Sequence, residues 1–134
     1  MPHQAVPANQ RLDVLQVFAD ATPVVQLLMF ILICLLIASV AVWVGQMAQG
    51  RRRAGLGDTL LSGVLVSAPL IGLTAAAYDL LNMSIGAANV RPAPNLTVLA
   101  PGFAEASLCI LLGLLAASFA AAFRAHLRVI SPQS

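Results

Sequence analysis

Three long apolar segments constrain the fold of this chain more than any other feature. Residues 21–47 contain no charged side chain, residues 59–78 form a second uncharged run, and a third apolar run extends from about residue 104 to residue 123. The densest apolar part of the first run, residues 24–46, would span about 34 Å as a helix, which exceeds a hydrocarbon core of about 30 Å. The sequence therefore predicts three transmembrane helices.

The composition agrees with a membrane protein. Of the 134 residues, 60% are hydrophobic and 9% are charged, with no lysine, whereas soluble domains carry about 25% charged residues. No basic, aromatic-interleaved patch predicts nucleic-acid binding. We recognise no nucleophile–base pair, phosphate loop or zinc spacing, so the sequence predicts neither an enzyme nor a cofactor or metal site. Cys34 and Cys109 lie in apolar runs and are expected to pack as small hydrophobes.

The arginines predict the orientation in the membrane. Arg51–Arg53 follow the first apolar segment, and Arg124 and Arg128 follow the third, whereas Arg11 and Arg91 lie on the other side. Basic residues are enriched in cytoplasmic loops. The side with five arginines should be the cytoplasm, so we expect the N-terminus outside and the C-terminus inside.

The segment before the first span has its own pattern. Leu12, Leu15, Val17 and Phe18 recur at roughly helical spacing among polar residues. This pattern favours a periplasmic amphipathic helix at the membrane surface, broken near Pro23. A frayed tail is the alternative.

The two connections differ in character. The connection formed by residues 48–58 is short and basic, and Asp58 is placed to cap the second helix. Residues 89–102 contain three prolines and a glycine and cannot be helical throughout. We therefore predict an all-α membrane protein with this order: periplasmic segment 1–22, transmembrane helix 23–47, cytoplasmic loop 48–58, transmembrane helix 59–83, periplasmic loop 84–102, transmembrane helix 103–126 and cytoplasmic tail 127–134.

Two carboxylates lie within or at the edge of the predicted spans. Asp79 is near the outer end of the second and Glu105 near the outer start of the third. Acidic residues in membrane spans are unfavourable and usually face a bundle interior or a water-filled path. Alternatively, both could lie in the headgroup layer and cap or solubilise helix ends. Residue chemistry alone leaves both interpretations open for Glu105 and favours the helix-end role for Asp79.

Small residues are frequent in the second and third spans. In the second span they include Gly72 and residues 75–77, and in the third span they dominate residues 113–122. Such residues allow helices to approach closely in lipid. They favour an oligomer or a partner helix, although packing within one subunit would account for part of them.

Several short motifs stand together in these two spans. They are Ala68-Pro69, Ile71-Gly72-Leu73, Ile85-Gly86, Ala100-Pro101-Gly102, Ala104-Glu105-Ala106, Gly113-Leu114 and Ala116-Ala117. With these motifs the chain resembles the MotA/TolQ/ExbB proton-channel family, most closely its ExbB and TolQ branch. The resemblance covers residues 12–128, with Trp43 near the inner end of the first span.

The resemblance implies a function. Members of the family form a homopentamer in the bacterial inner membrane, whose second and third helices line a pore. The pore holds the single helices of two ExbD/TolR-like partners, each with a membrane Asp. Proton flow moves the partner and powers work at the periplasm or outer membrane. Glu105 occupies the position of the family's glutamate near the periplasmic mouth of the proton path.

The chain also departs from the family pattern. Ala75 and Ala76 stand where the family has a pore-facing threonine motif, and Ile110 replaces a second threonine. Thr74, Ser107 and Asp79 are the polar residues that could substitute, and with Glu105 they form the expected ion pathway. The residues expected to pack the pore and the helices are Gly72, Ala75, Ala76, Ile110, Gly113 and Ala117. The cytoplasmic domain and extension usual in the family are nearly absent.

Two functions therefore stay open. The first is a minimal stator subunit driven by the proton motive force, favoured by Glu105 and Asp79. The second is a non-conducting scaffold subunit that keeps the fold without the ion path, favoured by the missing threonines. A neighbouring gene for a short protein with one Asp-containing span would favour the stator.

Overall fold

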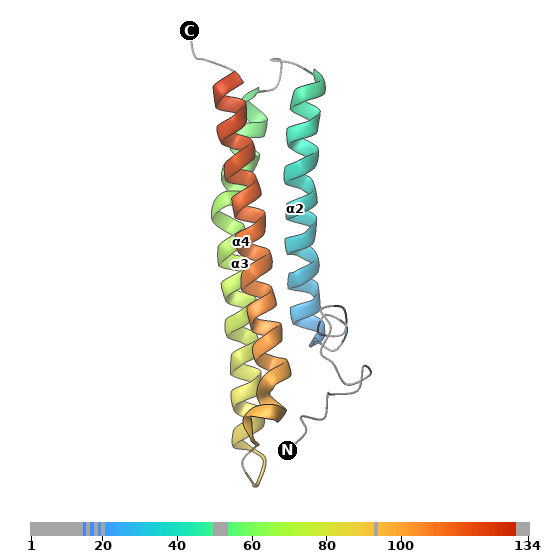
Figure 1. The fold of residues 1–134 in the computed structure, drawn as a ribbon, viewed down its shortest axis with the longest axis vertical. Coiled ribbons are helices and arrows are strands. Elements are labelled where there is room, and N and C mark those ends of the chain that lie inside the picture. The colour runs from blue at the N-terminus through green and yellow to red at the C-terminus, as the bar shows by residue number, and fades with distance from the viewer. Residues whose placement is uncertain are drawn as a thin grey trace, which may run out of the picture.

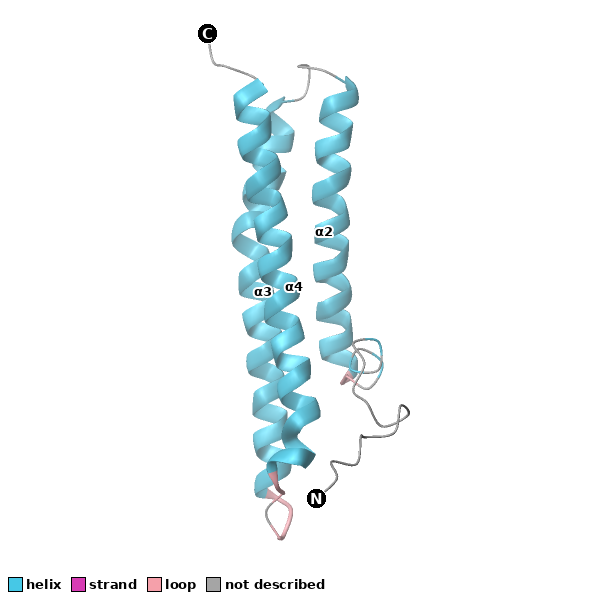
Figure 2. Ribbon diagram, in the orientation of Figure 1, coloured by secondary structure: helices cyan, strands magenta, loops and turns pink. Residues whose placement is uncertain are grey.

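Three long helices make up most of the chain. The structure, a computed structural model, describes residues 15, 17, 19, 21–49, 54–92 and 94–130. Within this part it contains no strand, which confirms the all-helical class. The helices are α2 (Pro23–Gln49), α3 (Ala54–Ala88) and α4 (Leu96–Ile130), as Figures 1 and 2 show.

Each helix is long and apolar enough to cross a membrane. The candidate spans are Pro23–Ala48, Gly55–Ala88 and Leu96–Val129. Large aliphatic and aromatic side chains are exposed along all three, for example Phe30, Leu70 and Leu111. A surface this apolar suits contact with lipid. The chain is a multi-pass membrane protein.

The helices form an elongated bundle in which α3 and α4 pair as an antiparallel hairpin and α2 lies against both (Figure 1). With 27 residues, α2 is shorter than α3 and α4, which have 35 each, a difference of about 12 Å along the axis. At the end that carries the α3–α4 turn, the hairpin therefore projects beyond the start of α2. The C-terminal ends of α2 and α4 lie together at the opposite end.

The helix ends differ from the predicted ones. Because α3 begins at Ala54, Asp58 lies inside the helix, and the prediction that it caps the helix was wrong. The helix α4 begins at Leu96, where the side-chain oxygen of Asn95 accepts a hydrogen bond from the N–H of Val98 at 3.1 Å. That geometry is an N-cap. The non-helical turn is therefore shorter than the predicted loop 84–102, and Pro101 lies within α4.

Small residues form the contact between α3 and α4. A Cβ atom placed on Gly72 would lie 2.7 Å from the carbonyl oxygen of Cys109, and one on Gly113 would lie 2.7 Å from the carbonyl oxygen of Ala68. The two backbones approach too closely for larger side chains. Buried alanines extend this contact: Ala68, Ala75, Ala76, Ala106, Ala116, Ala117 and Ala120. Packing within one subunit therefore accounts for much of the small-residue pattern.

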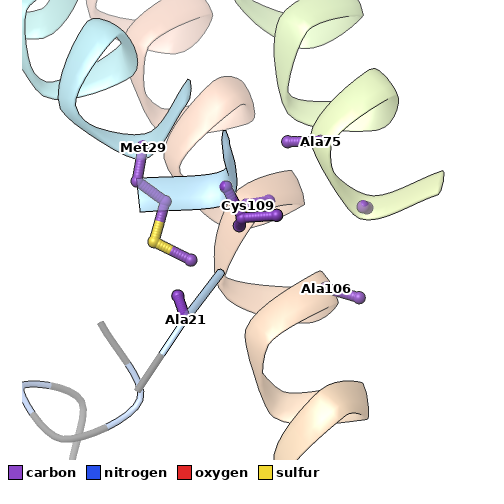
Figure 3. Packing of buried hydrophobic residues seen from close by; sticks show 7 residues of the cluster. Ala21, Met29, Ala75, Ala106 and Cys109 are labelled. Carbon is purple, nitrogen blue, oxygen red and sulfur yellow. The ribbon is translucent and has the colours of Figure 1, made fainter. Parts of the chain in front are cut away.

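Larger side chains attach α2 to the hairpin. Val25, Met29 and Leu32 are fully buried against α3 and α4. Figure 3 shows Met29 and Ala21 on one side of Cys109, with Ala75 of α3 and Ala106 of α4 nearby. This cluster lies at the start of α2, so it brings the segment before α2 onto the hairpin.

The amphipathic helix expected before the first span lies mostly outside the described residues. Of the residues that define it, Leu15 and Val17 are helical and described, and Leu15 is exposed. The helix stops before the bend at Ala21, and α2 begins at Pro23. The amphipathic helix and its position relative to a membrane therefore stay predictions.

Candidate functional site

Asp79 and Glu105 are buried on the two helices of the hairpin. Asp79 lies nine residues before Ala88, the last residue of α3, and Glu105 lies nine residues after Leu96, the first residue of α4. Both acids are thus about 14 Å along their helices from the turn. Asp79 is 5% exposed and Glu105 is 9% exposed. Matching positions on an antiparallel hairpin bring these two carboxyl groups to the same level of the bundle.

The carboxyl groups of Asp79 and Glu105 interact electrostatically. Oδ2 of Asp79 and Oε1 of Glu105 are both buried without a hydrogen-bond partner within the described residues. In that part of the chain the ion pairs of acidic side chains involve Asp58, at the other end of the bundle. The acid pair is therefore enclosed by the bundle, and the described residues bring no compensating cation to it.

The segment before α2 covers the acid pair. The backbone N–H of Thr22 donates a hydrogen bond to the Glu105 carboxyl group, and Ala21 is 6% exposed. The side chain of Gln26 donates to the carbonyl oxygen of Ala19 at 2.9 Å, which ties this segment to α2. A backbone N–H favours the ionised form of the carboxyl group that it contacts. The site thus draws on three segments of the chain.

Cys109 completes the surroundings of the acid pair. It follows Glu105 by about one helical turn, so both side chains lie on the same face of α4. Its thiol is fully buried, is free, and interacts electrostatically with both carboxyl groups. Cys34, by contrast, is exposed on the surface of α2. Glu105, Cys109, Gly113 and Ala116 are all buried, so this face of α4 is turned toward the inside of the bundle.

Thr74 and Ser107 lie apart from the acid pair. Both are exposed, and each donates its hydroxyl hydrogen to its own helix: Thr74 to the carbonyl oxygen of Leu70 at 2.8 Å, and Ser107 to that of Phe103 at 2.7 Å. The structure therefore brings together two of the four expected ion-pathway residues. It places the other two on the outer surface of the bundle.

Ala75, Ala76 and Ile110 pack inside the bundle. Ala75 is 0% and Ala76 is 3% exposed, in the same apolar cluster as Met29 and Cys109. Ile110 is partly buried against this cluster. Of the other expected packing residues, Gly72 and Gly113 form the closest α3–α4 contact and Ala117 is buried.

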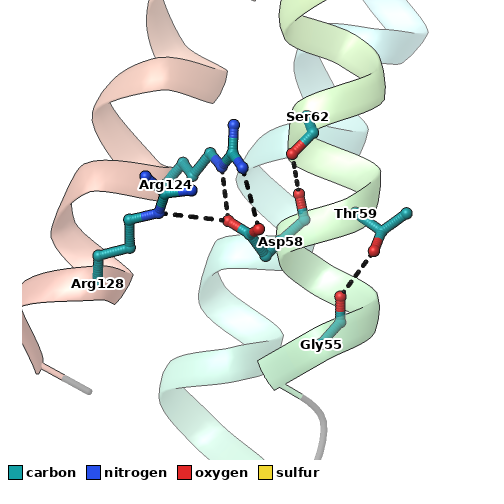
Figure 4. A network of polar contacts seen from close by, with 6 residues as sticks. All are labelled: Gly55, Asp58, Thr59, Ser62, Arg124 and Arg128. Carbon is teal, nitrogen blue, oxygen red and sulfur yellow. Dashed lines mark hydrogen bonds and ion pairs between the residues drawn. The ribbon is translucent and has the colours of Figure 1, made fainter. Parts of the chain in front are cut away.

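The opposite end of the bundle is held by polar and aromatic contacts. Arg124 donates to Asp58 through Nε at 2.6 Å and through a terminal nitrogen at 3.1 Å, and Arg128 lies 3.8 Å from the same carboxylate (Figure 4). The ring of Trp43 stacks on Phe123 at a centroid distance of 5.0 Å. These contacts join α3 to α4 and α2 to α4.

No sequence pattern indicates the contact of Thr22 with Glu105 or the pairing of Asp58 with Arg124. Both contacts join residues that are far apart in the chain, and neither belongs to a spacing motif. The position of Cys109 beside Glu105 can be predicted from the sequence, because residues four apart are neighbours on a helix surface.

Two buried carboxyl groups can bind and release protons, and this is the chemistry that the site offers. The described residues contain no group of three or more His, Cys, Asp and Glu side chains that could hold a metal ion. In comparisons with known proteins, no family model, curated sequence or solved structure matches this chain.

Proposed function

We propose that this chain is the stator subunit of an ExbB/TolQ-like motor driven by the proton motive force. In this proposal five copies form a ring in the bacterial inner membrane, with the N-terminus in the periplasm and the C-terminus in the cytoplasm. The ring encloses single-span, ExbD/TolR-like partners, in two copies, each with a membrane Asp. Proton flow then powers transport or envelope work at the periplasm or outer membrane.

The acid pair is the observation that carries this proposal. Asp79 and Glu105 are buried inside a membrane-spanning bundle, and each has an oxygen without a partner among the described residues. Unpaired acids are unfavourable in such surroundings unless they have a role there, and proton relays are a common one. A purely structural helix cap would instead place its carboxylate on free N–H groups at a helix end.

The exposed hydroxyl groups of α3 and α4 favour the proposal that a partner helix binds beside them. Thr74 of α3 and Ser107 of α4 lie on the outer surface of the subunit. Ala77 of α3 and Ala121 of α4 are exposed small residues that would allow a neighbouring helix to approach closely. These surfaces, rather than the buried glycines and alanines, are the ones available for a ring and its occupant.

Proton transport by the complex tests the proposal. The chain and a candidate single-span partner are co-expressed, purified as a complex and placed in liposomes with a pH-sensitive dye under an imposed gradient. We expect flux with the complex, and none when the partner's membrane Asp is changed to Asn. An intact complex that conducts no better than empty liposomes would contradict the stator.

The alternative is a non-conducting scaffold subunit, and the packing around Ala75 and Ala76 favours it. These residues lie in a closed apolar cluster with Ile110 beside it, and none of the three side chains can donate or accept a hydrogen bond. A stable complex without ion flux is the result expected for the scaffold.

A further inference from the structure

Arg124 and Arg128 of α4 outnumber the acid that they share at one end of the bundle. Arg124 donates through Nε to one carboxylate oxygen of Asp58 at 2.6 Å and through a terminal nitrogen to the other at 3.1 Å. Nε of Arg128 lies 3.8 Å from the same carboxylate, which is beyond hydrogen-bond distance, and the Arg128 side chain is 64% exposed. Both arginines reach this carboxylate from α4 (Figure 4). The three side chains together carry one positive charge in excess.

The sequence supplies no further acidic side chain to this end of the bundle. Of the five acidic residues, two precede α2, and Asp79 and Glu105 lie toward the α3–α4 turn. Residues 50–53, which join α2 to α3, are one glycine and three arginines, and residues 131–134, which follow α4, carry no charged side chain. An anion from outside the chain is therefore needed to balance the excess positive charge.

The arginines lie at the edge of a surface that suits lipid. The candidate spans of α3 and α4 include Asp58 and Arg128, and Val129, next to Arg128, is 79% exposed. Arg124 follows Glu105 by 19 residues, which is about 28 Å along the helix and close to a hydrocarbon thickness of about 30 Å. Long basic side chains at such an edge extend into the headgroup layer. The anions that a membrane presents in that layer are the phosphate groups of its lipids.

We propose that this end of the bundle binds the phosphate group of an anionic lipid, with Arg128 as the main ligand and Arg124 beside it. Arginine presents a planar fork of donors that matches phosphate oxygens. Because Asp58 holds the guanidinium of Arg124, Arg128 is the more available of the two. The inference requires only a membrane-spanning chain and goes beyond the proposed stator, since a scaffold subunit would bind the lipid equally well.

Trp43, the single tryptophan of the chain, is a natural probe of this end. The centroid of its ring lies 5.0 Å from that of Phe123 and 5.9 Å from that of His126. Phe123 and His126 are within one helical turn of Arg124 in α4. Bromine atoms on lipid chains quench tryptophan fluorescence only at short range. Quenching of Trp43 therefore measures which lipid adjoins the two arginines.

The test places the full chain in lipid nanodiscs of equal parts phosphatidylglycerol and phosphatidylcholine. The bromine atoms are carried by one lipid in the first sample and by the other lipid in the second. Comparing the two quenching values gives the local enrichment of the anionic lipid, and the exposure of the Trp43 ring cancels because both samples contain the same protein. We expect an enrichment of about fivefold, the size that one arginine near an anionic surface gives. Equal quenching by the two lipids would overturn the proposal.

Variants assign the enrichment to the arginines. Arg128→Gln should lower it severalfold, because it removes the available guanidinium. Asp58→Asn should raise it, because Arg124 is released and the excess charge grows. Since these two changes act in opposite directions, a loss of the fold cannot produce both results. Arg91→Gln is the matched control, because Arg91 is an exposed arginine at the α3–α4 turn, and it should leave the enrichment unchanged.

Three results would contradict this assignment. They are an unchanged enrichment in Arg128→Gln, a fall in Asp58→Asn, and a loss in Arg91→Gln as large as that in Arg128→Gln. Inorganic phosphate then separates a lipid from a soluble anion. Replacing chloride by phosphate at constant ionic strength should leave the enrichment unchanged, and displacement of the lipid would show that the arginines bind a soluble anion, against the proposal.

The lipid site and the stator can fail separately. A chain that enriches the anionic lipid but never conducts protons with a partner contradicts the stator alone. Proton flux without enrichment of the lipid contradicts the lipid site alone.

Discussion

Gly72 of α3 and Gly113 of α4 face each other so closely that a Cβ atom on Gly72 would lie 3.2 Å from the Cα atom of Gly113. This contact fixes the distance between the two helices that carry the acids. Because the neighbouring atoms are backbone atoms, they cannot move aside independently. The level and the rotation of Asp79 and Glu105 therefore depend on a glycine contact about two turns away along each helix.

The first prediction concerns this contact. Gly72→Ala should lower the free energy of unfolding by about 1–3 kcal/mol, because the new methyl group meets backbone atoms and overpacks the interface. Gly63→Ala is the control, since nothing lies within 4 Å of a Cβ atom there, and it should be neutral or stabilise the helix by up to about 1 kcal/mol. Thermal unfolding in detergent measures the stability of both variants. An equal change in stability for the two variants would contradict the close contact at Gly72.

The second prediction concerns the ion pair at the other end of the bundle. Arg124→Gln should destabilise the chain only slightly, because Arg124 and Asp58 are partly exposed, with 26% and 44% of their side-chain surfaces accessible, and exposed ion pairs contribute little. Arg128→Gln should have a smaller effect, since Arg128 lies 3.8 Å from the carboxylate and is 64% exposed. Unfolding in low and high salt checks both. A larger loss for Arg128→Gln would contradict the geometry.

The third prediction concerns proton flux in liposomes that contain the complex. Glu105→Gln should lower the flux strongly and Asp79→Asn more modestly, because each removes an acid from the proposed path. Asp58→Asn is the matched control, since this acid lies at the opposite end of the bundle, and it should retain flux. If Glu105→Ala left the function intact, Glu105 would be a structural residue.

The fourth prediction concerns Ile110. Ile110→Thr should preserve or raise the proton flux, because a hydroxyl group can donate and accept hydrogen bonds where an aliphatic side chain cannot. Its partly buried side chain packs against the cluster around Met29 and Cys109, so thermal unfolding should be measured in parallel. A fall in flux at unchanged stability would place Ile110 outside the path.

The fifth prediction concerns the assembly. We expect five copies in a closed ring, and mass measurement in detergent or averaging of particle images in lipid would determine the number. Substituting the exposed Ala121 by Trp should weaken the ring with little effect on the subunit fold. A stable monomer, or a ring with an even number of copies, would contradict the proposed pentamer.

The three spans follow from the sequence because apolar runs of this length are sufficient to predict membrane helices without any knowledge of tertiary contacts. The helix ends follow less well. Asp58 has the residue type of a cap and Pro101 that of a helix breaker, yet each lies within a helix. Their positions depend on contacts from elsewhere, such as the pairing of Asp58 with Arg124.

The sequence alone determined that two acids lie in or near the spans and which residues are small enough for close packing. Only the tertiary structure decided that Asp79 and Glu105 are buried at the same level of the bundle, with Thr22 beside Glu105, while Thr74 and Ser107 are exposed. The physical reason is that these helices are apolar on nearly all sides, so no polar face in the sequence indicates how each one is rotated. Their rotation is set by the fit of small residues between α3 and α4, which exists only once the helices are packed.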